Sequence, residues 1–116
     1  MQFLFILNDA PYGSERVYNG LRLANTLCTR QDAEVVLFLI GDAASAAKSG
    51  QQTPNGYYNV ERMLAGVLHK GATVRVCGTC MDARGLKATE LVEGASRSNM
   101  DDLGTMTMNA DKVLVF

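Results

Sequence analysis

The sequence predicts an α/β protein with a three-layer α/β/α architecture around a five-stranded parallel sheet. Three short apolar segments, "QFLFIL" at 2–7, "EVVLFLI" at 34–40 and "KVLVF" at 112–116, are typical of strands buried on both faces. Amphipathic helical segments alternate with the strands, which favours parallel pairing. The chain has 116 residues, 47% of them apolar, which suffices for one core. We therefore expect one domain, residues 1–116.

The first helix is predicted over residues 14–30, after the first strand. Its apolar residues recur at spacings of three and four, and Ser14 is placed to cap its first N–H groups. Those apolar residues are Val17, Leu21, Ala24 and Leu27. Beyond the second strand, Asp42 is a candidate N-cap for a short helix that ends near Gly50.

For the middle of the chain, the sequence predicts a turn, a helix and a strand. Pro54-Asn55-Gly56 has turn chemistry, and Asn59 opens an amphipathic pattern that ends at His69-Lys70 and Gly71. The third strand is expected at 73–77.

The last third of the chain predicts a helix at 85–94 and a short fourth strand within 93–98. Ser98 and Asp101 resemble a capping box that starts a further helix. The fifth strand follows at 112–116.

The charge distribution excludes several classes of function. The formal net charge is -1, with acidic and basic residues spread along the chain, so we expect neither nucleic-acid nor membrane partners. No segment is long and apolar enough for a bilayer span, and the N-terminus lacks a secretion signal, which predicts a cytoplasmic protein. Glycine-rich phosphate loops are absent, and we expect no cofactor.

The three cysteines are an odd number in a chain that needs no disulfide framework, which favours reduced thiols. Cys28 falls inside the first helix and is expected to serve in packing. The segment "VCGTCMDARGL" at 76–86 contains the other two, directly after the third strand. Ligands of parallel α/β sheets gather beyond the carboxyl ends of the strands, where Asn8, Asp42 and Cys80 can come together.

Cys80 is the candidate nucleophile of this segment. A free thiol is only about 3% ionised at pH 7, and a helix N-terminus or a guanidinium favours the thiolate. Arg84 and backbone N–H groups are expected to stabilise the Cys80 thiolate, with Asp82 orienting the arginine or capping the next turn. Cys77 ends the strand, where burial would keep its thiol inert.

The C-x-x-C spacing also admits two other interpretations. A structural zinc site needs four ligands, and the chain offers one close pair besides His69 and Cys28, so we predict no metal. A thioredoxin-type dithiol would follow an early strand, and neither Pro11 nor Pro54 sits just before a later strand.

Five segments, in order and over essentially the whole chain, resemble the DsrE/DsrF/YchN-like family. They are "NDAPYGSERVYNGLRLA", "FLIGDA", "GYYNVERML", "VCGTCMDARG" and "ADKVLVF". The resemblance implies a three-layer fold, assembly into homo-trimers or hexamers, and a sulfur-relay cysteine after the third strand that carries sulfur as a persulfide.

Residue by residue, Cys80 matches the family's sulfur-carrying position, and Asp82, Arg84 and Gly85 match the rest of that motif. The resemblance further implies that loop residues at the strand ends line a pocket. In this chain they are Asn8, Tyr12, Gly13 and Asp42.

The resulting expectation is a sulfur carrier or sulfurtransferase that forms a persulfide on Cys80 and exchanges sulfur with donor and acceptor proteins. Two alternatives stay open at this point. One is a homo-oligomeric binding or scaffold protein without turnover, and the other is a redox-sensing Cys77/Cys80 dithiol. In a carrier, Cys77 could attack the Cys80 persulfide, form a disulfide and release sulfide.

Overall fold

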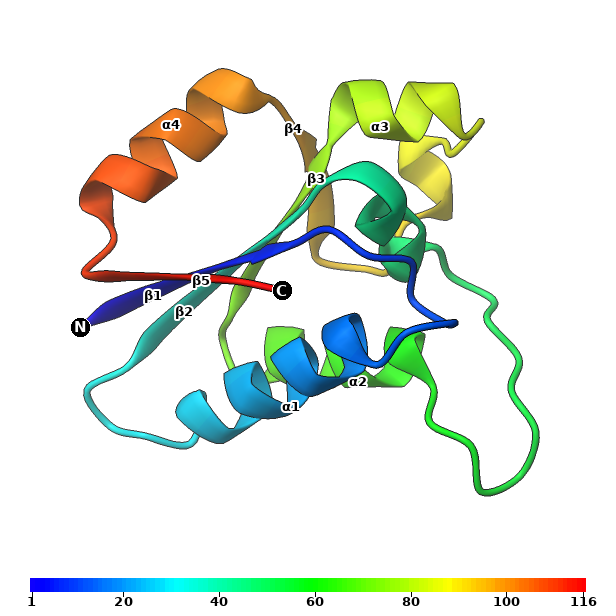
Figure 1. Cartoon of the computed structure of the whole chain (residues 1–116), viewed down its shortest axis with the longest axis horizontal. Helices are drawn as coiled ribbons and strands as arrows, with labels where there is room; N and C mark the ends of the chain where they lie inside the picture. The colour runs from blue at the N-terminus through cyan, green and yellow to red at the C-terminus, as the bar shows by residue number, and fades with distance from the viewer.

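A computed structural model describes residues 1–116 and confirms the predicted fold class (Figure 1). All five strands lie in one parallel sheet with the order β4-β3-β2-β1-β5. The elements, in chain order, are β1 (Gln2–Leu7), α1 (Arg16–Leu27), β2 (Glu34–Leu39), the 3-10 helix η1 (Gly41–Ala47), α2 (Val60–His69), β3 (Thr73–Cys77), α3 (Gly78–Ala83), the 3-10 helix η2 (Ala88–Glu90), β4 (Ala95–Ser98), α4 (Met100–Asn109) and β5 (Lys112–Val115).

One face of the sheet is covered by α1 and α2, which pack side by side (Figure 1). Alternate residues of the strands enter this larger core, because successive side chains of a strand point to opposite faces. The strand residues on this face include Phe5 and Leu7 from β1 and Val35, Leu37 and Leu39 from β2.

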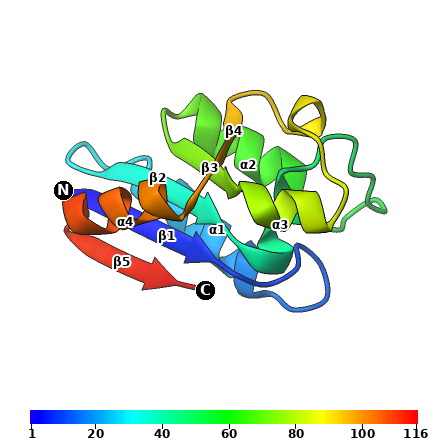
Figure 2. The same cartoon turned by 90° about the horizontal axis from the view of Figure 1, so that it is seen from above.

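The other face is covered by α4, as the view from above shows (Figure 2). The intervening strand residues form a smaller cluster with Leu103 of this helix. The cluster contains Leu4, Val36, Phe38, Cys77 and Leu103. Cys77 therefore belongs to the α4 side of the sheet, and Phe38 of the neighbouring strand lies in the same cluster.

The carboxyl ends of β1, β2 and β3 are adjacent, and short helices follow two of them directly. η1 begins two residues after β2, and α3 begins with the residue after Cys77. Gly41 lies close to the end of β1, since a Cβ on Gly41 would be 3.5 Å from the Asn8 carbonyl oxygen. This arrangement brings η1 and α3 together over the end of the sheet (Figure 1).

The predicted helix at 85–94 is wrong. Gly85 adopts φ +64°, a conformation that ends α3, and the following backbone bonds to η1 and the residues just after it. Val92 N–H donates to the Ala47 carbonyl and Ser49 N–H to the Glu90 carbonyl, both at 2.8 Å. These tertiary bonds satisfy backbone groups that a helix would otherwise use, so only η2 forms there.

Several predicted caps lie one residue off or have another role. α1 begins after Glu15 rather than at Ser14, and α4 is capped by Asn99, whose side chain accepts from Asp102 N–H at 2.8 Å. Asp42 lies inside η1 and caps nothing. Asn59 caps α2 as predicted, accepting from Arg62 N–H at 3.0 Å.

We predict that Leu21→Ala lowers the free energy of unfolding by about 2–5 kcal/mol, because Leu21 is fully buried between α1 and the sheet. Leu23→Ala, two residues along the same helix and 38% exposed, is the matched control and should cost well under half as much. Urea unfolding of both variants measures the difference. Equal losses would contradict the assigned helix face.

Candidate functional site

The site is built where β3 passes into α3 without a loop. Cys77 is both the last residue of β3 and the N-cap of α3, and Cys80 lies three residues further, within the first turn. Positions three apart in a helical turn lie on one face, so the two thiols meet. The Cys80 thiol donates to the Cys77 sulfur, with the sulfur atoms 2.7 Å apart. Cys80 therefore lies in a helix that follows the strand directly.

Cys77 is a buried thiol whose sulfur accepts hydrogen bonds. It is only 8% exposed, and its sulfur accepts from the Cys80 backbone N–H at 3.4 Å, while the Thr79 hydroxyl lies 3.4 Å away. Burial raises the pKa of the Cys77 thiol, but the hydrogen bonds from Cys80 and Thr79 outweigh burial and leave that pKa below its ordinary value. Cys77 is buried as the sequence predicts, and its hydrogen bonds act against the effect of that burial on its pKa.

Cys80 has the opposite tendency. Burial and its hydrogen bond to Cys77 raise the pKa of the Cys80 thiol, and the Gly41 N–H, which donates to this sulfur at 3.1 Å, acts against the rise. Gly41 holds φ +60°, a conformation that side chains rarely adopt. Within the pair, Cys77 is therefore the thiol that gives up its proton more readily.

Arg84 does not donate to either thiol. Its Nε and Nη2 donate to Asp42 Oδ1 at 3.2 and 2.6 Å, and its Nη1 donates to the Cys80 carbonyl at 3.0 Å. The guanidinium thereby links α3 to η1 and acts on the Cys80 sulfur only through its charge, which favours the thiolate. Its partner is Asp42, not Asp82.

Asp82 orients a different arginine, Arg97 of β4. Arg97 Nη1 and Nη2 donate to the two Asp82 carboxylate oxygens at 2.8 and 2.9 Å, a bidentate pair that holds the pKa of Asp82 below its usual range. The guanidinium lies over Gly78, since a Cβ on Gly78 would be 2.7 Å from Arg97 Nε. The guanidinium can lie beside the start of α3 because Gly78 has no side chain.

A cleft of about 520 Å³ opens on the Cys77 side of the pair. Its lining combines apolar and polar groups and comes from the end of β2, the start of α3 and the passage from β4 to α4. The lining residues are Phe38, Cys77, Gly78, Thr79, Arg97, Ser98, Asn99 and Met100. Cys80 does not line it and faces Gly41 instead.

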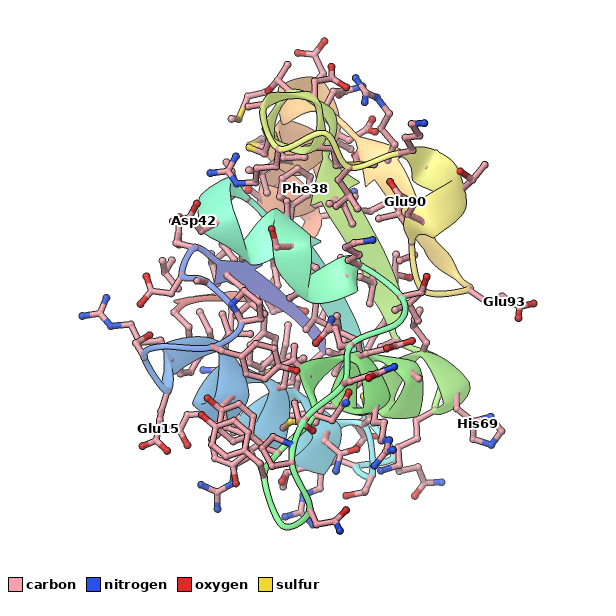
Figure 3. The ribbon with its side chains drawn as sticks, turned by 90° about the vertical axis from the view of Figure 1, so that its right-hand side faces the viewer. Glu15, Phe38, Asp42, His69, Glu90 and Glu93 are labelled. Atoms are coloured by element: carbon pink, nitrogen blue, oxygen red, sulfur yellow. The ribbon has the colours of Figure 1, made fainter.

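The remaining sequence-predicted residues separate into two groups. Asn8 binds the chain terminus, donating from Nδ2 to the Phe116 carbonyl at 3.2 Å, and Gly85 ends α3. Gly13 lines a second hollow away from the thiols, and Tyr12 packs against two tyrosines of that hollow. In Figure 3, Asp42 on η1 and Glu15 of this hollow are well separated.

Tyr18, Tyr57 and Tyr58 line the second hollow, and Tyr12, the fourth tyrosine of the chain, packs against two of them. Tyr58 stacks against Tyr18 and Tyr57, with ring centroids 4.3 and 4.6 Å apart, and Tyr12 lies 5.6 Å from it. The Tyr12 hydroxyl donates to Gln51 Oε1 at 2.6 Å and accepts from Val60 N–H at 3.1 Å. These bonds tie the 50–58 loop to the start of α2.

Sequence reasoning missed Gly41, Gly78, Thr79 and Arg97. Arg97 carried no motif signal, because β4 is short and the register that places Arg97 opposite Val76 follows from tertiary packing. Thr79 lies within the 76–86 segment, but its contact with Cys77 depends on the helical turn that forms there. The two glycines follow or end strands, which is a signal for close backbone approach.

Cys28 is the third thiol of the chain and lies outside the pair. Cys28 packs against the core at the end of α1, and burial raises the pKa of its thiol. Nowhere do three His, Cys, Asp or Glu side chains converge to hold a metal ion. None of the helices has the length and apolar character that crossing a membrane requires.

Comparison with known proteins places these observations in a family. The family model described as the DsrE/DsrF-like family matches residues 1–116. The uncharacterised protein MJ0989 of Methanocaldococcus jannaschii is 40% identical over 116 residues and all of both chains, and YchN of Escherichia coli is 37% identical over 99% of this chain and 98% of its own.

Solved structures agree with the sequence comparisons. The crystal structure of YchN from E. coli superposes with a TM-score of 0.93 at 37% identity, covering 99% of this chain and 98% of that one. The MTH1491 protein of unknown function from Methanobacterium thermoautotrophicum shares the fold, with a TM-score of 0.79 at 10% identity over 99% and 98% of the two chains. This chain belongs to the DsrE/DsrF-like family.

Proposed function

We propose that this protein is a small sulfur carrier that holds a sulfane sulfur as a persulfide on Cys80, with Cys77 as its proton acceptor. The observation that supports the proposal best is the contact between the two thiols, 2.7 Å apart at the carboxyl end of the sheet. The DsrE-like family is associated with sulfur relay, which agrees with this chemistry.

In the proposed transfer step, Cys77 acts as the base and Cys80 as the nucleophile. With a persulfide donor R–S–SH, the Cys77 thiolate accepts the proton of the Cys80 thiol. The Cys80 sulfur then attacks the outer sulfur of the donor, forming Cys80–S–SH and releasing R–S⁻. The S–H contact supplies the path for the proton, and the Gly41 N–H stabilises negative charge on the Cys80 sulfur.

The scaffold around Cys80 supports this role. Arg84 fixes the Cys80 backbone through its carbonyl and is itself held by Asp42, so the thiol is presented by two anchored segments. The proposal includes separate donor and acceptor proteins for the sulfur and self-association of the chain into trimers or hexamers.

We predict that the reduced protein, incubated with a persulfide donor, gains about 32 Da on the peptide that contains Cys80. Because Cys77 and Cys80 lie close in sequence, fragmentation of the alkylated peptide must assign the sulfur between them. Cys28→Ser, which removes the thiol outside the pair, is the matched control and should load normally. The proposal is contradicted if the native protein stays unmodified, or if no persulfide is finally found on Cys80.

The hydrogen bond from Cys80 also predicts a pH dependence. Its loss removes one group that lowers the pKa of Cys77, so the Cys77 thiolate should form at higher pH in Cys80→Ala than in Cys80→Ser, whose hydroxyl can still donate. The pH midpoint of iodoacetamide labelling of Cys77, in a Cys28→Ser background, measures this order. Equal midpoints would show that the side chain at position 80 does not stabilise the Cys77 thiolate.

The same contact favours a second candidate function, a redox dithiol. Two thiols in contact can close into a disulfide when a disulfide such as oxidised glutathione accepts their electrons and leaves as two thiols. Equilibration with glutathione buffers separates the two functions. A midpoint near the cytosolic poise of about −220 to −260 mV, without any sulfur loading, would favour the redox role.

A further inference from the structure

The cleft beside the thiol pair gives a bound molecule access to Cys77 but not to Cys80. Only Cys77 of the two thiols lines it, together with the guanidinium of Arg97 and the polar side chains of Thr79, Ser98 and Asn99. A donor in this cleft reaches the Cys77 sulfur first. Its chemical class should follow from the charge of the groups around it.

Arg97 is the one cation of this lining, and the structure holds it in place. The bidentate pair with Asp82 uses one N–H of each terminal nitrogen, which leaves the Nε N–H and one N–H on each terminal nitrogen for other acceptors. Gly78 leaves room for the guanidinium at the first residue after Cys77. The register pairs Cys77 with Ser98, so Arg97 is one residue away from the position opposite this thiol.

We propose that this cleft binds a small anionic sulfane donor of the thiosulfate class, and that Cys77 accepts the sulfur first and passes it to Cys80. This inference rests on the proposed sulfur-carrier function and adds its donor class, its entry route and Arg97 as the anion-binding residue. A volume of about 520 Å³ is ample for an anion of this size.

Both steps balance. The Cys77 thiolate attacks the outer sulfur of thiosulfate, the S–S bond of thiosulfate breaks, and Cys77–S–S⁻ and sulfite form. The Cys80 sulfur then attacks the outer sulfur of Cys77–S–S⁻, its proton moves to that outer sulfur, and Cys80–S–SH and the Cys77 thiolate result. The thiol contact brings the two sulfur atoms within reach for this second step.

The first test separates the two thiols with sodium thiosulfate as the probe. In Cys80→Ser we expect a gain of about 32 Da on Cys77, and in Cys77→Ser no loading from thiosulfate at all. Loading of Cys80 from thiosulfate in Cys77→Ser would overturn the inference.

The second test asks whether Arg97 recognises the charge of the donor. We expect Arg97→Gln to slow loading from thiosulfate roughly tenfold, as for the loss of one charge-assisted hydrogen bond. Loading from the persulfide of 2-mercaptoethanol, whose carbon part is uncharged, should change little. Equal slowing with both donors would overturn the assignment of Arg97.

Three variants control for charge and fold. Arg97→Gln combined with Asp82→Asn keeps the net charge and should still lose loading from thiosulfate, whereas Arg30→Gln, outside the cleft, should load normally. Gly78→Ala should behave like Arg97→Gln, since its methyl group displaces the guanidinium. Circular dichroism of each variant confirms folding.

Loading of the native protein with the two donors distinguishes a failure of this inference from a failure of the proposed function. If thiosulfate fails with the native protein while 2-mercaptoethanol persulfide loads Cys80, the inference is wrong and the sulfur-carrier function stands. If neither donor loads the native protein, the sulfur-carrier function is wrong as well.

Discussion

The contact between the Cys77 and Cys80 sulfur atoms is the interaction on which the rest of the site depends. It exists because β3 becomes α3 without a loop, so that Cys77 ends the strand and caps the helix while Cys80 completes its first turn. The same geometry lets the Cys80 N–H bond to the Cys77 sulfur. The two thiols therefore titrate as a coupled pair, in which the more buried Cys77 gives up its proton more readily.

The two sides of the thiol pair are built by different neighbours. On the Cys80 side, Gly41 supplies a backbone N–H, and the ion pair of Asp42 and Arg84 locks η1 to α3. On the Cys77 side lies the cleft with Arg97. A half-buried thiol with one N–H donor suits the holding of a reactive sulfur, whereas a cleft with a guanidinium suits the arrival of an anion. This difference between the two sides is the basis of the proposed sulfur transfer from Cys77 to Cys80.

The sheet could be predicted from the sequence because buried parallel strands have a strong local signal, and all five strand positions agree with the structure to within a residue or two. The helix expected at 85–94 failed because its backbone bonds to η1 and the chain just after it, which no local pattern shows. For the site, the sequence placed Cys77 at the end of the third strand and Cys80 shortly after it, and the structure agrees with these positions. The contact between the two sulfur atoms and the pairing of Arg84 with Asp42 could not be foreseen, since both depend on which strand ends and helices the fold brings together.

The coupling of the two thiols is tested most directly by the ultraviolet absorbance of the thiolates in the reduced Cys28→Ser protein, followed as a function of pH. We predict two separate ionisations for the pair. The first lies below the ordinary cysteine pKa of about 8.5 and belongs mainly to Cys77, and the second lies above it, because Cys80 then loses its proton beside a charged neighbour. Two coincident ionisations near 8.5 would contradict the claim that the thiols act as one unit.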